Sequence, residues 1–447
     1  PVEVVRAVLD RIERVNPKLN AYCTLVPHLA LKAARAAERA VMKKKALGPL
    51  HGVPVSIKDL VPTAGIRTTW GSKLYEHHIP DEDGLVVARL KAAGAIVIGK
   101  TNTPEFGAGA NTYNAVFGPT RNPWNPALTC GGSSGGAAVA LATGMGPLAQ
   151  GSDLGGSLRI PAAFCGVVGF RTTPGLVPVY PSQLGWDTYS VQGPMARTVA
   201  DTALMLAAIS GPDERVPISF QVDTREFVRA VKAPSVKRLR VAWSPDLGIA
   251  PVERQVKQVA ETAAKVFARL GARVEDGHPD FSTVQEIIRV SRGLRMAALH
   301  ADKLAKWREV MNPNLVWNIE QGLKLSAEDV GKAETLRTEL WGRVRMFFSR
   351  YDLLLTPTVA VLPFPVEIPY PKEVNGRPMA NYIDWVLPTY AFTVVGLPAI
   401  SVPAGWTADG LPVGLQIVGR WRGEASVLRA AAAFEAASPW ADKIPPV

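Results

Sequence analysis

Cysteine and histidine are scarce in this sequence. Its 447 residues include three cysteines and six histidines, and no two cysteines have the C-x-x-C spacing. An odd number of scattered cysteines offers no disulfide framework, and no cluster of His, Cys or carboxylate residues has zinc-ligand spacing. We therefore expect a cytoplasmic protein, kept in a reducing compartment, that uses neither a metal nor another cofactor.

Uninterrupted apolar runs are also missing. The two long uncharged stretches, 123–152 and 385–408, are broken by prolines, and the first is rich in glycine. A membrane helix needs about 20 consecutive apolar residues that satisfy their own backbone. The first sixteen residues carry apolar side chains at helical spacing between charges, which predicts an amphipathic helix rather than a signal peptide. The sequence therefore predicts no membrane partner.

The positive charge is not concentrated in one place. The formal net charge is +11, but the densest basic runs, 43–45 and 237–240, are short and flank apolar segments. A nucleic-acid site needs a continuous basic patch or stripe that can neutralise phosphates. We therefore expect no nucleic-acid partner.

Helical and strand-like patterns alternate along the chain. Strands rich in β-branched residues between helices indicate an α/β protein whose sheet is covered on both faces. No repeat or low-complexity linker interrupts the pattern, so we expect a single large domain over 1–447. The predicted helices are 30–42, 85–93, 256–270 and 425–437, and the predicted strands are 53–57, 95–98, 239–243, 353–355, 399–402 and 413–418.

One stretch matches a nucleotide-binding motif. Gly94, Gly99, Lys100 and Thr101 fit G-x-x-x-x-G-K-[ST]. In a P-loop the strand precedes the motif, and the intervening residues form a loop whose N–H groups face phosphate. Here the intervening residues, Ala-Ile-Val-Ile, have the composition of the strand itself. We therefore interpret the match as a coincidence.

A second stretch matches the nucleophile elbow of α/β-hydrolases. Gly131 to Gly135 fit G-x-S-x-G with Ser133 at the centre. That elbow needs a strand directly before it and a histidine later in the chain. Residues 125–130 make a poor strand, and the downstream histidines are His278, in a turn-like sequence, and His300, on a helical pattern. A Ser-His-Asp enzyme remains an alternative.

A third pattern involves two loops of glycine and serine and one lysine. Residues 130–138 read CGGSSGGAA, residues 151–159 read GSDLGGSLR, and Lys58 follows a predicted buried strand. Glycines allow several backbone N–H groups to converge on one point, which is how an oxyanion hole is made. A lysine acts as a base only when it is uncharged, and burial favours that state. The pattern predicts a hydrolase that uses serine and lysine.

These residues resemble those of the amidase signature family. Lys58 precedes Ser133 by 75 residues and Ser133 precedes Ser157 by 24, as in the family pattern. The resemblance extends from residue 20 to about 437 and implies that family's fold, with a central mixed sheet. Its supporting runs include KAAGA (91–95), GKTN (99–102), NPWN (122–125), IPA (160–162), GVVGF (166–170) and PVGLQ (412–416).

The resemblance also implies a role for each matching residue. It gives a catalytic core at about 50–205, with Ser157 as nucleophile, Ser133 as a bridging serine after a cis peptide bond from Gly132, and Lys58 as base. The implied oxyanion hole consists of the backbone N–H groups of Leu154, Gly155, Gly156 and Ser157. The residues expected to fix these loops are Asp153, Ser134 and Arg159.

The mechanism that follows is amide hydrolysis. Neutral Lys58 takes a proton from Ser133, which takes one from Ser157 as that residue attacks the carbonyl carbon. Ser133 then returns a proton to the leaving amine, and water releases the acyl group from Ser157. The substrate is expected to be a small-molecule amide or carbamate, and a homodimer is compatible with the sequence.

The family branch is indicated by a few departures. The A subunit of the tRNA-dependent amidotransferase usually carries Met-Asp-Glu-Phe where this chain has Thr-Pro-Glu-Phe at 103–106. It also carries Thr and Gln where this chain has Leu154 and Ile160. The departures favour a free-standing amidase of the aryl acylamidase and urethanase-like branch. The alternatives that remain are a non-catalytic binding protein and this amidotransferase subunit.

The substrate pocket is expected to come from variable segments at about 176–192, 282–325 and 363–385. Four aromatic residues fall in or near the last segment, and we consider two roles for them, as core or as pocket lining. If they line the pocket, uncharged and bulky substrates such as aryl amides or aryl carbamates are favoured. These residues are Tyr382, Trp385, Tyr390 and Phe392.

Overall fold

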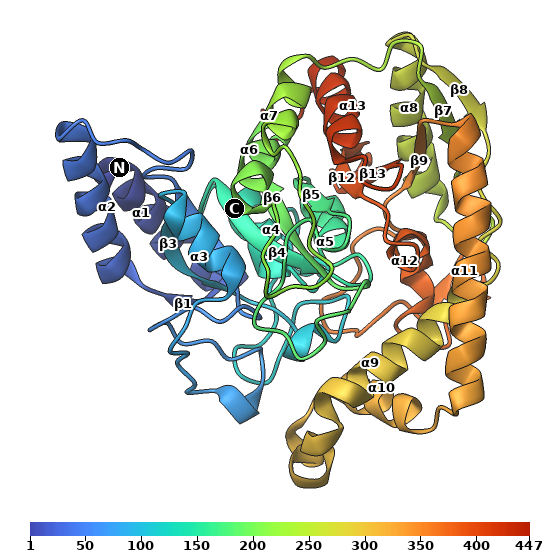
Figure 1. Ribbon diagram of the computed structural model, residues 1–447, viewed down its shortest axis with the longest axis horizontal. Helices are drawn as coiled ribbons and strands as arrows, with labels where there is room; N and C mark the ends of the chain where they lie inside the picture. Colours follow the sequence, from blue (N-terminus) through green and yellow to red (C-terminus); the bar gives the residue numbers. More distant parts are fainter.

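The computed structural model describes residues 1–447, and eleven of its strands form one mixed sheet (Figure 1). The order across the sheet is β1-β3-β2-β4-β6-β5-β12-β13-β9-β7-β8. A separate two-stranded ribbon pairs β10 (Glu373–Val374) with β11 (Arg377–Pro378). The eleven strands are β1 (Tyr22–Leu25), β2 (Pro54–Lys58), β3 (Ile96–Thr101), β4 (Leu148–Asp153), β5 (Val168–Arg171), β6 (Val191–Ala196), β7 (Arg240–Trp243), β8 (Arg273–Asp276), β9 (Leu353–Pro357), β12 (Ala399–Trp406) and β13 (Pro412–Gly419).

Helices cover both faces of this sheet (Figure 1). The α-helices are α1 (Val2–Leu19), α2 (Pro27–Met42), α3 (Leu85–Ala92), α4 (Gly135–Ala142), α5 (Arg159–Cys165), α6 (Val199–Ile209), α7 (Arg225–Lys232), α8 (Arg254–Arg269), α9 (Val284–Trp307), α10 (Pro313–Leu323), α11 (Ala327–Arg350), α12 (Leu387–Thr393) and α13 (Glu424–Ala437). Four short 3₁₀ helices are η1 (Lys73–Tyr75), η2 (Glu105–Gly107), η3 (Arg308–Val310) and η4 (Asp384–Val386).

The side chains of β9 show how the two faces are filled. Leu353 and Leu355 belong to the core cluster that includes residues of α3, α6, α8 and α13, whereas Leu354 belongs to the cluster that includes residues of α5, α9 and α12. Successive side chains of a strand point to opposite faces, so an apolar run such as this one is buried on both. The predicted fold class, an α/β domain with helices on both faces of a mixed sheet, is confirmed.

Most of the predicted elements are present with small shifts at their ends. The segment that matches the P-loop motif is β3, whose backbone pairs with β1 and β2, so it forms no phosphate-binding loop. The loop predicted to begin at Gly151 begins at Leu154, because 148–153 pair with β6 as strand β4. No helix combines the length and the apolar composition that crossing a bilayer requires.

Four element ends meet at one edge of the sheet. Strands β2 and β4 are parallel neighbours, with Ser56 opposite Ala149, so their carboxyl ends lie side by side. Strand β2 ends at Lys58, and β4 ends at Asp153. Helix α4 starts just after the first glycine–serine loop, and α5 starts just after the second. This arrangement brings all three serine- and lysine-bearing segments to the same place.

Candidate active site

Lys58 is the last residue of β2 and is fully buried. Its Nζ atom lies 2.7 Å from Ser133 Oγ, 2.9 Å from Ser134 Oγ and 3.0 Å from Ser152 Oγ. No carboxylate lies within ion-pair distance of it. Burial lowers the pKa of Lys58 to about 7, against the opposing effect of the Asp153 charge. A large fraction of this side chain is therefore uncharged near neutral pH.

The first glycine–serine loop holds two serines against this lysine. The peptide bond between Gly132 and Ser133 is cis, and Ser133 is 2% exposed. A Cβ atom on Gly132 would lie 2.8 Å from the carbonyl carbon of Asn111, so only glycine fits there. The backbone N–H of Ser134 donates to the carbonyl oxygen of Ser157 at 3.2 Å. The two loops are thus in direct contact.

The second loop carries backbone N–H groups without partners. The N–H groups of Leu154, Gly155 and Ser157 donate to no group within the chain, and Leu154 and Ser157 are half-buried rather than enclosed. Unpaired backbone donors are rare in buried positions, and a cluster of them is suited to hold an oxyanion. Gly156 differs, because its N–H donates to Asp153 Oδ1 at 2.9 Å. Its predicted place in the oxyanion hole is therefore not supported.

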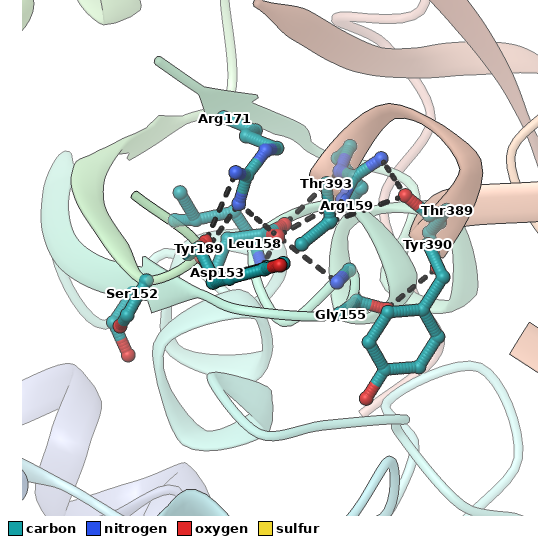
Figure 2. A network of polar contacts seen from close by, with 12 residues as sticks. Ser152, Asp153, Gly155, Leu158, Arg159, Arg171, Tyr189, Thr389, Tyr390 and Thr393 are labelled. Carbon is teal, nitrogen blue, oxygen red and sulfur yellow. Dashed lines mark hydrogen bonds and ion pairs between the residues drawn. The ribbon is translucent and has the colours of Figure 1, made fainter. Parts of the chain in front are cut away.

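Asp153 fixes the loop through a buried charge network (Figure 2). Its carboxylate accepts hydrogen bonds from Arg159 Nε and Nη2, from Arg171 Nη1 and from the N–H groups of Gly156 and Leu158. Burial alone would raise the pKa of Asp153, but the two guanidinium groups outweigh it and hold this pKa well below its usual range. Because both carboxylate oxygens are engaged in several hydrogen bonds, the loop is held rigidly.

Arg159 connects this network to distant parts of the chain. Its Nη1 atom donates to the carbonyl oxygen of Thr389 at 2.9 Å and to Gln416 Oε1 at 2.6 Å. Thr389 in turn donates from Oγ1 to the carbonyl oxygen of Gly155 at 2.6 Å (Figure 2). Helix α12 and strand β13 therefore hold the second glycine–serine loop through hydrogen bonds.

The sequence did not single out several of these residues. Ser152 contacts Lys58. In the sequence it is only one residue of a glycine–serine run, and no role was predicted for it. Arg171 and Thr389 lie in segments that gave no catalytic signal, and their roles depend on folding. Gln416 belongs to the PVGLQ run. A glutamine within an otherwise apolar strand could have indicated a buried polar contact.

The four aromatic residues near α12 fall into two groups. Trp385 stacks with Phe164 and meets Phe364 edge-on, and Phe392 meets Phe281 edge-on, so these two belong to the core. Tyr382 and Tyr390 are also buried, but their hydroxyl groups accept hydrogen bonds from Arg292. Tyr390 lies against Gly155, so a buried cation that the sequence did not indicate lies close to the second glycine–serine loop.

The two histidines of the Ser-His-Asp alternative do not reach either serine. The side-chain partner of Ser133 is Lys58, while His278 hydrogen-bonds the carbonyl group of Pro279. His300 packs against Phe106 with the rings tilted by 37° and their centroids 4.5 Å apart. Neither glycine–serine loop is thus paired with a histidine base.

A cavity of about 600 Å³ lies apart from Lys58 and the two serine loops, none of whose residues line it. It is lined by residues 183–189, by α9 and by α11, and its apolar members include Leu184, Trp186 and Leu294. The first two segments were among those predicted to vary with substrate. The carbonyl oxygen of Tyr189, on its rim, accepts a hydrogen bond from Arg171 Nη2 at 3.0 Å. One arginine therefore joins this cavity to Asp153.

No three His, Cys, Asp or Glu side chains are grouped so that they could hold a metal ion. The groups at this site that can carry chemistry are hydroxyls, one amine and backbone amides. Together they can transfer protons, form a covalent acyl bond and stabilise a negative oxygen.

Comparisons with known proteins give one consistent result. The family model described as Amidase matches residues 3–428. An acylamidase from Rhodococcus erythropolis is 41% identical, with 100% of this chain and 94% of the relative aligned. The A subunit of the glutamyl-tRNA(Gln) amidotransferase from Geobacter metallireducens is 35% identical over 98% of this chain and 94% of its own length. A solved bacterial aryl acylamidase of the amidase signature family superposes with a TM-score of 0.91 at 33% identity, covering 98% and 93% of the two chains.

Proposed function

The chain belongs to the amidase family of hydrolases, and from that premise we propose that it hydrolyses bulky or aryl amides through an acyl-enzyme on Ser157. The observation that carries this proposal is the position of Lys58. Its amine is buried, has a pKa of about 7 and lies 2.7 Å from Ser133 Oγ. An uncharged amine in contact with a hydroxyl can act as a general base.

The three serines around Lys58 have different parts in this mechanism. A neutral amine has two N–H donors and one lone pair, so it can donate to Ser134 and Ser152 while it accepts from Ser133. The contact with Ser133 is the shortest of the three, as expected for the proton-transfer partner. Ser133 then accepts the proton of Ser157 during attack and returns it to the leaving nitrogen.

Stabilisation of the oxyanion falls to backbone N–H groups. Those of Leu154, Gly155 and Ser157 are free to donate, and Asp153 with its two arginines holds the loop in place. Donors that are already oriented lose no energy to reorganisation during the reaction, which makes them effective in catalysis. Loss of one such donor typically costs about 10²–10³-fold in kcat.

We further propose that the cavity lined by residues 183–189, which Arg171 joins to Asp153 through the Tyr189 carbonyl group, takes the aryl or acyl group of the substrate. A cavity of about 600 Å³ with aromatic and aliphatic members can take an aryl or long acyl group. The proposal extends to aryl carbamates, which can enter the same relay and release carbon dioxide after hydrolysis. The location we propose is the cytoplasm, and the substrate is a small molecule.

A second candidate is the A subunit of a tRNA-dependent amidotransferase, since relatives of that description are 35% identical. Ile160 argues for a free-standing amidase. It is buried, and its side chain lies against Gly131 and Gly156 of the two loops. An apolar side chain there gives a primary amide such as that of glutamine no hydrogen-bond partner.

The test compares kcat/KM for an anilide, an aryl carbamate and free glutamine, with Ser157→Ala as the control. We expect the anilide to be turned over best and Ser157→Ala to abolish all turnover. Preference for glutamine would support the amidotransferase reading. Turnover by Ser157→Ala above about a tenth of the wild-type rate would rule out Ser157 as nucleophile.

A further inference from the structure

Arg292 is a buried cation with no carboxylate partner. It lies on α9 and is 5% exposed, and its Nε and Nη2 atoms donate to the Tyr382 hydroxyl at 2.9 and 2.5 Å. Nε also lies 3.0 Å from Asn318 Oδ1, and Nη1 lies 3.1 Å from the Tyr390 hydroxyl. Arg159 and Arg171, by contrast, share Asp153. Burying an uncompensated charge is costly, so a use for Arg292 is expected.

The Tyr390 hydroxyl links Arg292 to the second glycine–serine loop, which carries Ser157. A Cβ atom on Gly155 would lie 2.2 Å from Tyr390 Cζ and 2.4 Å from its hydroxyl oxygen, so the ring and hydroxyl lie directly against that glycine. In Figure 2 the side chain of Tyr390, which belongs to α12, and that of Ser152 both point away from Arg171. Lys58 is in contact with Ser152. Tyr390 therefore faces the reacting side of the loop.

The proton of the Tyr390 hydroxyl has no acceptor within the chain. The oxygen accepts from Arg292, and the group donates to nothing. Burial raises the pKa of Tyr390 to about 12, against the opposing charge of Arg292, so the proton stays on the oxygen at neutral pH. A hydroxyl that accepts a bond from a cation is polarised and becomes a stronger donor. Tyr390 thus offers a strong hydrogen-bond donor beside Gly155.

The proposed mechanism leaves one substituent of the tetrahedral intermediate without a protein partner. The oxyanion faces the free N–H groups, the leaving nitrogen faces Ser133, and the third substituent is Ser157 Oγ itself. The fourth is the first atom of the acyl group. Because Tyr390 covers Gly155 and carries the free donor, it is the group placed to contact that atom.

We propose that Tyr390, held and polarised by Arg292, donates a hydrogen bond to an oxygen atom bonded to the reacting carbonyl carbon on the acyl side. That chemistry selects carbamates, whose alkoxy oxygen occupies this position, over amides of the same shape, which have a methylene group there. The inference rests on the proposed function and specifies its substrate class.

Two substrates with the same leaving group test this inference. The ethyl carbamate and the butanamide of 4-nitroaniline differ only in an oxygen or a methylene group next to the carbonyl carbon. The ratio of their kcat/KM values is measured in the wild type and in Tyr390→Phe, which keeps the ring against Gly155. The matched control is Tyr351→Phe, which removes a tyrosine hydroxyl that donates to Glu275 of β8 at 3.2 Å.

We expect Tyr390→Phe to lower the carbamate-to-amide ratio about tenfold while the butanamide rate stays within about twofold. Tyr351→Phe should leave the ratio unchanged. Arg292→Gln should also lower the ratio and should have no further effect in the Tyr390→Phe background. If Arg292→Gln does not fold, the Tyr390→Phe result decides alone.

Two outcomes separate this inference from the proposed function. If butanamide hydrolysis depends on Ser157 but Tyr390→Phe leaves the ratio unchanged, or lowers both rates equally, the inference is overturned and the proposed function stands. If the wild type releases 4-nitroaniline from neither substrate, the proposed function fails and the inference fails with it.

Discussion

Two fully buried lysines stand on neighbouring strands of the same sheet, and their surroundings differ. Lys58 ends β2, and Lys100 lies in β3, opposite Ile57. Burial lowers the pKa of both, to about 7 for Lys58 and about 8 for Lys100. Burial alone therefore does not distinguish a base from a structural cation.

The partners of the two amines make the difference. Lys100 donates to the carbonyl oxygen of Val61 at 2.5 Å and to two threonine hydroxyls, and Asp59 Oδ1 lies 3.9 Å away. A carbonyl oxygen can only accept, and a carboxylate favours the charged amine. The partners of Lys58 are hydroxyls, each of which can donate or accept. Lys58 can change its protonation state without losing hydrogen bonds, and Lys100 cannot.

The largest expected effect comes from removing each amine in turn. Lys58→Met should reduce kcat/KM by about 10³-fold or more, because the base is lost. Lys100→Met should keep kcat/KM of the folded protein within about tenfold, but lower the free energy of unfolding by about 3 kcal/mol, because Asp59 loses its buried partner. Steady-state kinetics with a 4-nitroanilide and urea denaturation measure the two effects. A Lys100→Met protein of normal stability but without activity would contradict the comparison.

A smaller effect is expected from pH. The active form has neutral Lys58, whose pKa is about 7, so protonation below that value removes the base. The value of kcat/KM should rise about tenfold between pH 6 and pH 8 and then level off. The residual activity of Lys58→Ala should not show this rise. A rate optimum below about pH 6 would be incompatible with a lysine base.

The smallest effect should follow from a change to one hydroxyl around Lys58. The Ser152 oxygen accepts a hydrogen bond from the ammonium form, so Ser152→Ala should lower the pKa of Lys58. We expect the rising limb of the pH profile to move to lower pH by less than about one unit, and the rate at pH 8 to change less than about fivefold. Ser56→Ala, two residues before Lys58 on the same buried strand, is the control and should shift nothing. A shift to higher pH in Ser152→Ala would show that this hydroxyl stabilises the neutral amine instead.

Local signals in the sequence predicted much of the fold. Strand β2, with alternating β-branched residues, and helix α8, with one apolar face, were predicted within one or two residues of their ends. Strand β4 was not, because Gln150, Gly151 and Ser152 have low strand propensity and pair with β6 through tertiary context. The polar residues that made this strand hard to predict include Ser152, whose hydroxyl contacts Lys58.

The residues of the candidate site that could be predicted from the sequence are those that lie in a recognisable local pattern. Lys58, Ser133 and Ser157 stood out because glycines surround the serines and a buried strand precedes the lysine. Arg292 and Tyr390 did not, because nothing in an amphipathic helix or an aromatic segment indicates that an arginine will meet two phenols that lie 90 and 98 residues further along the chain. The occupied N–H of Gly156 was also beyond sequence reasoning, because it depends on the orientation of Asp153.

In the proposed mechanism Lys58 acts through Ser133 to make Ser157 the nucleophile. Its most direct test is inactivation with an aryl sulfonyl fluoride followed by peptide mapping by mass spectrometry, in the wild type and in Lys58→Ala. We expect one adduct, on Ser157, and inactivation at least about 10²-fold slower in Lys58→Ala. An adduct on Ser133 with Ser157 unmodified, or equal inactivation rates in the two proteins, would contradict it.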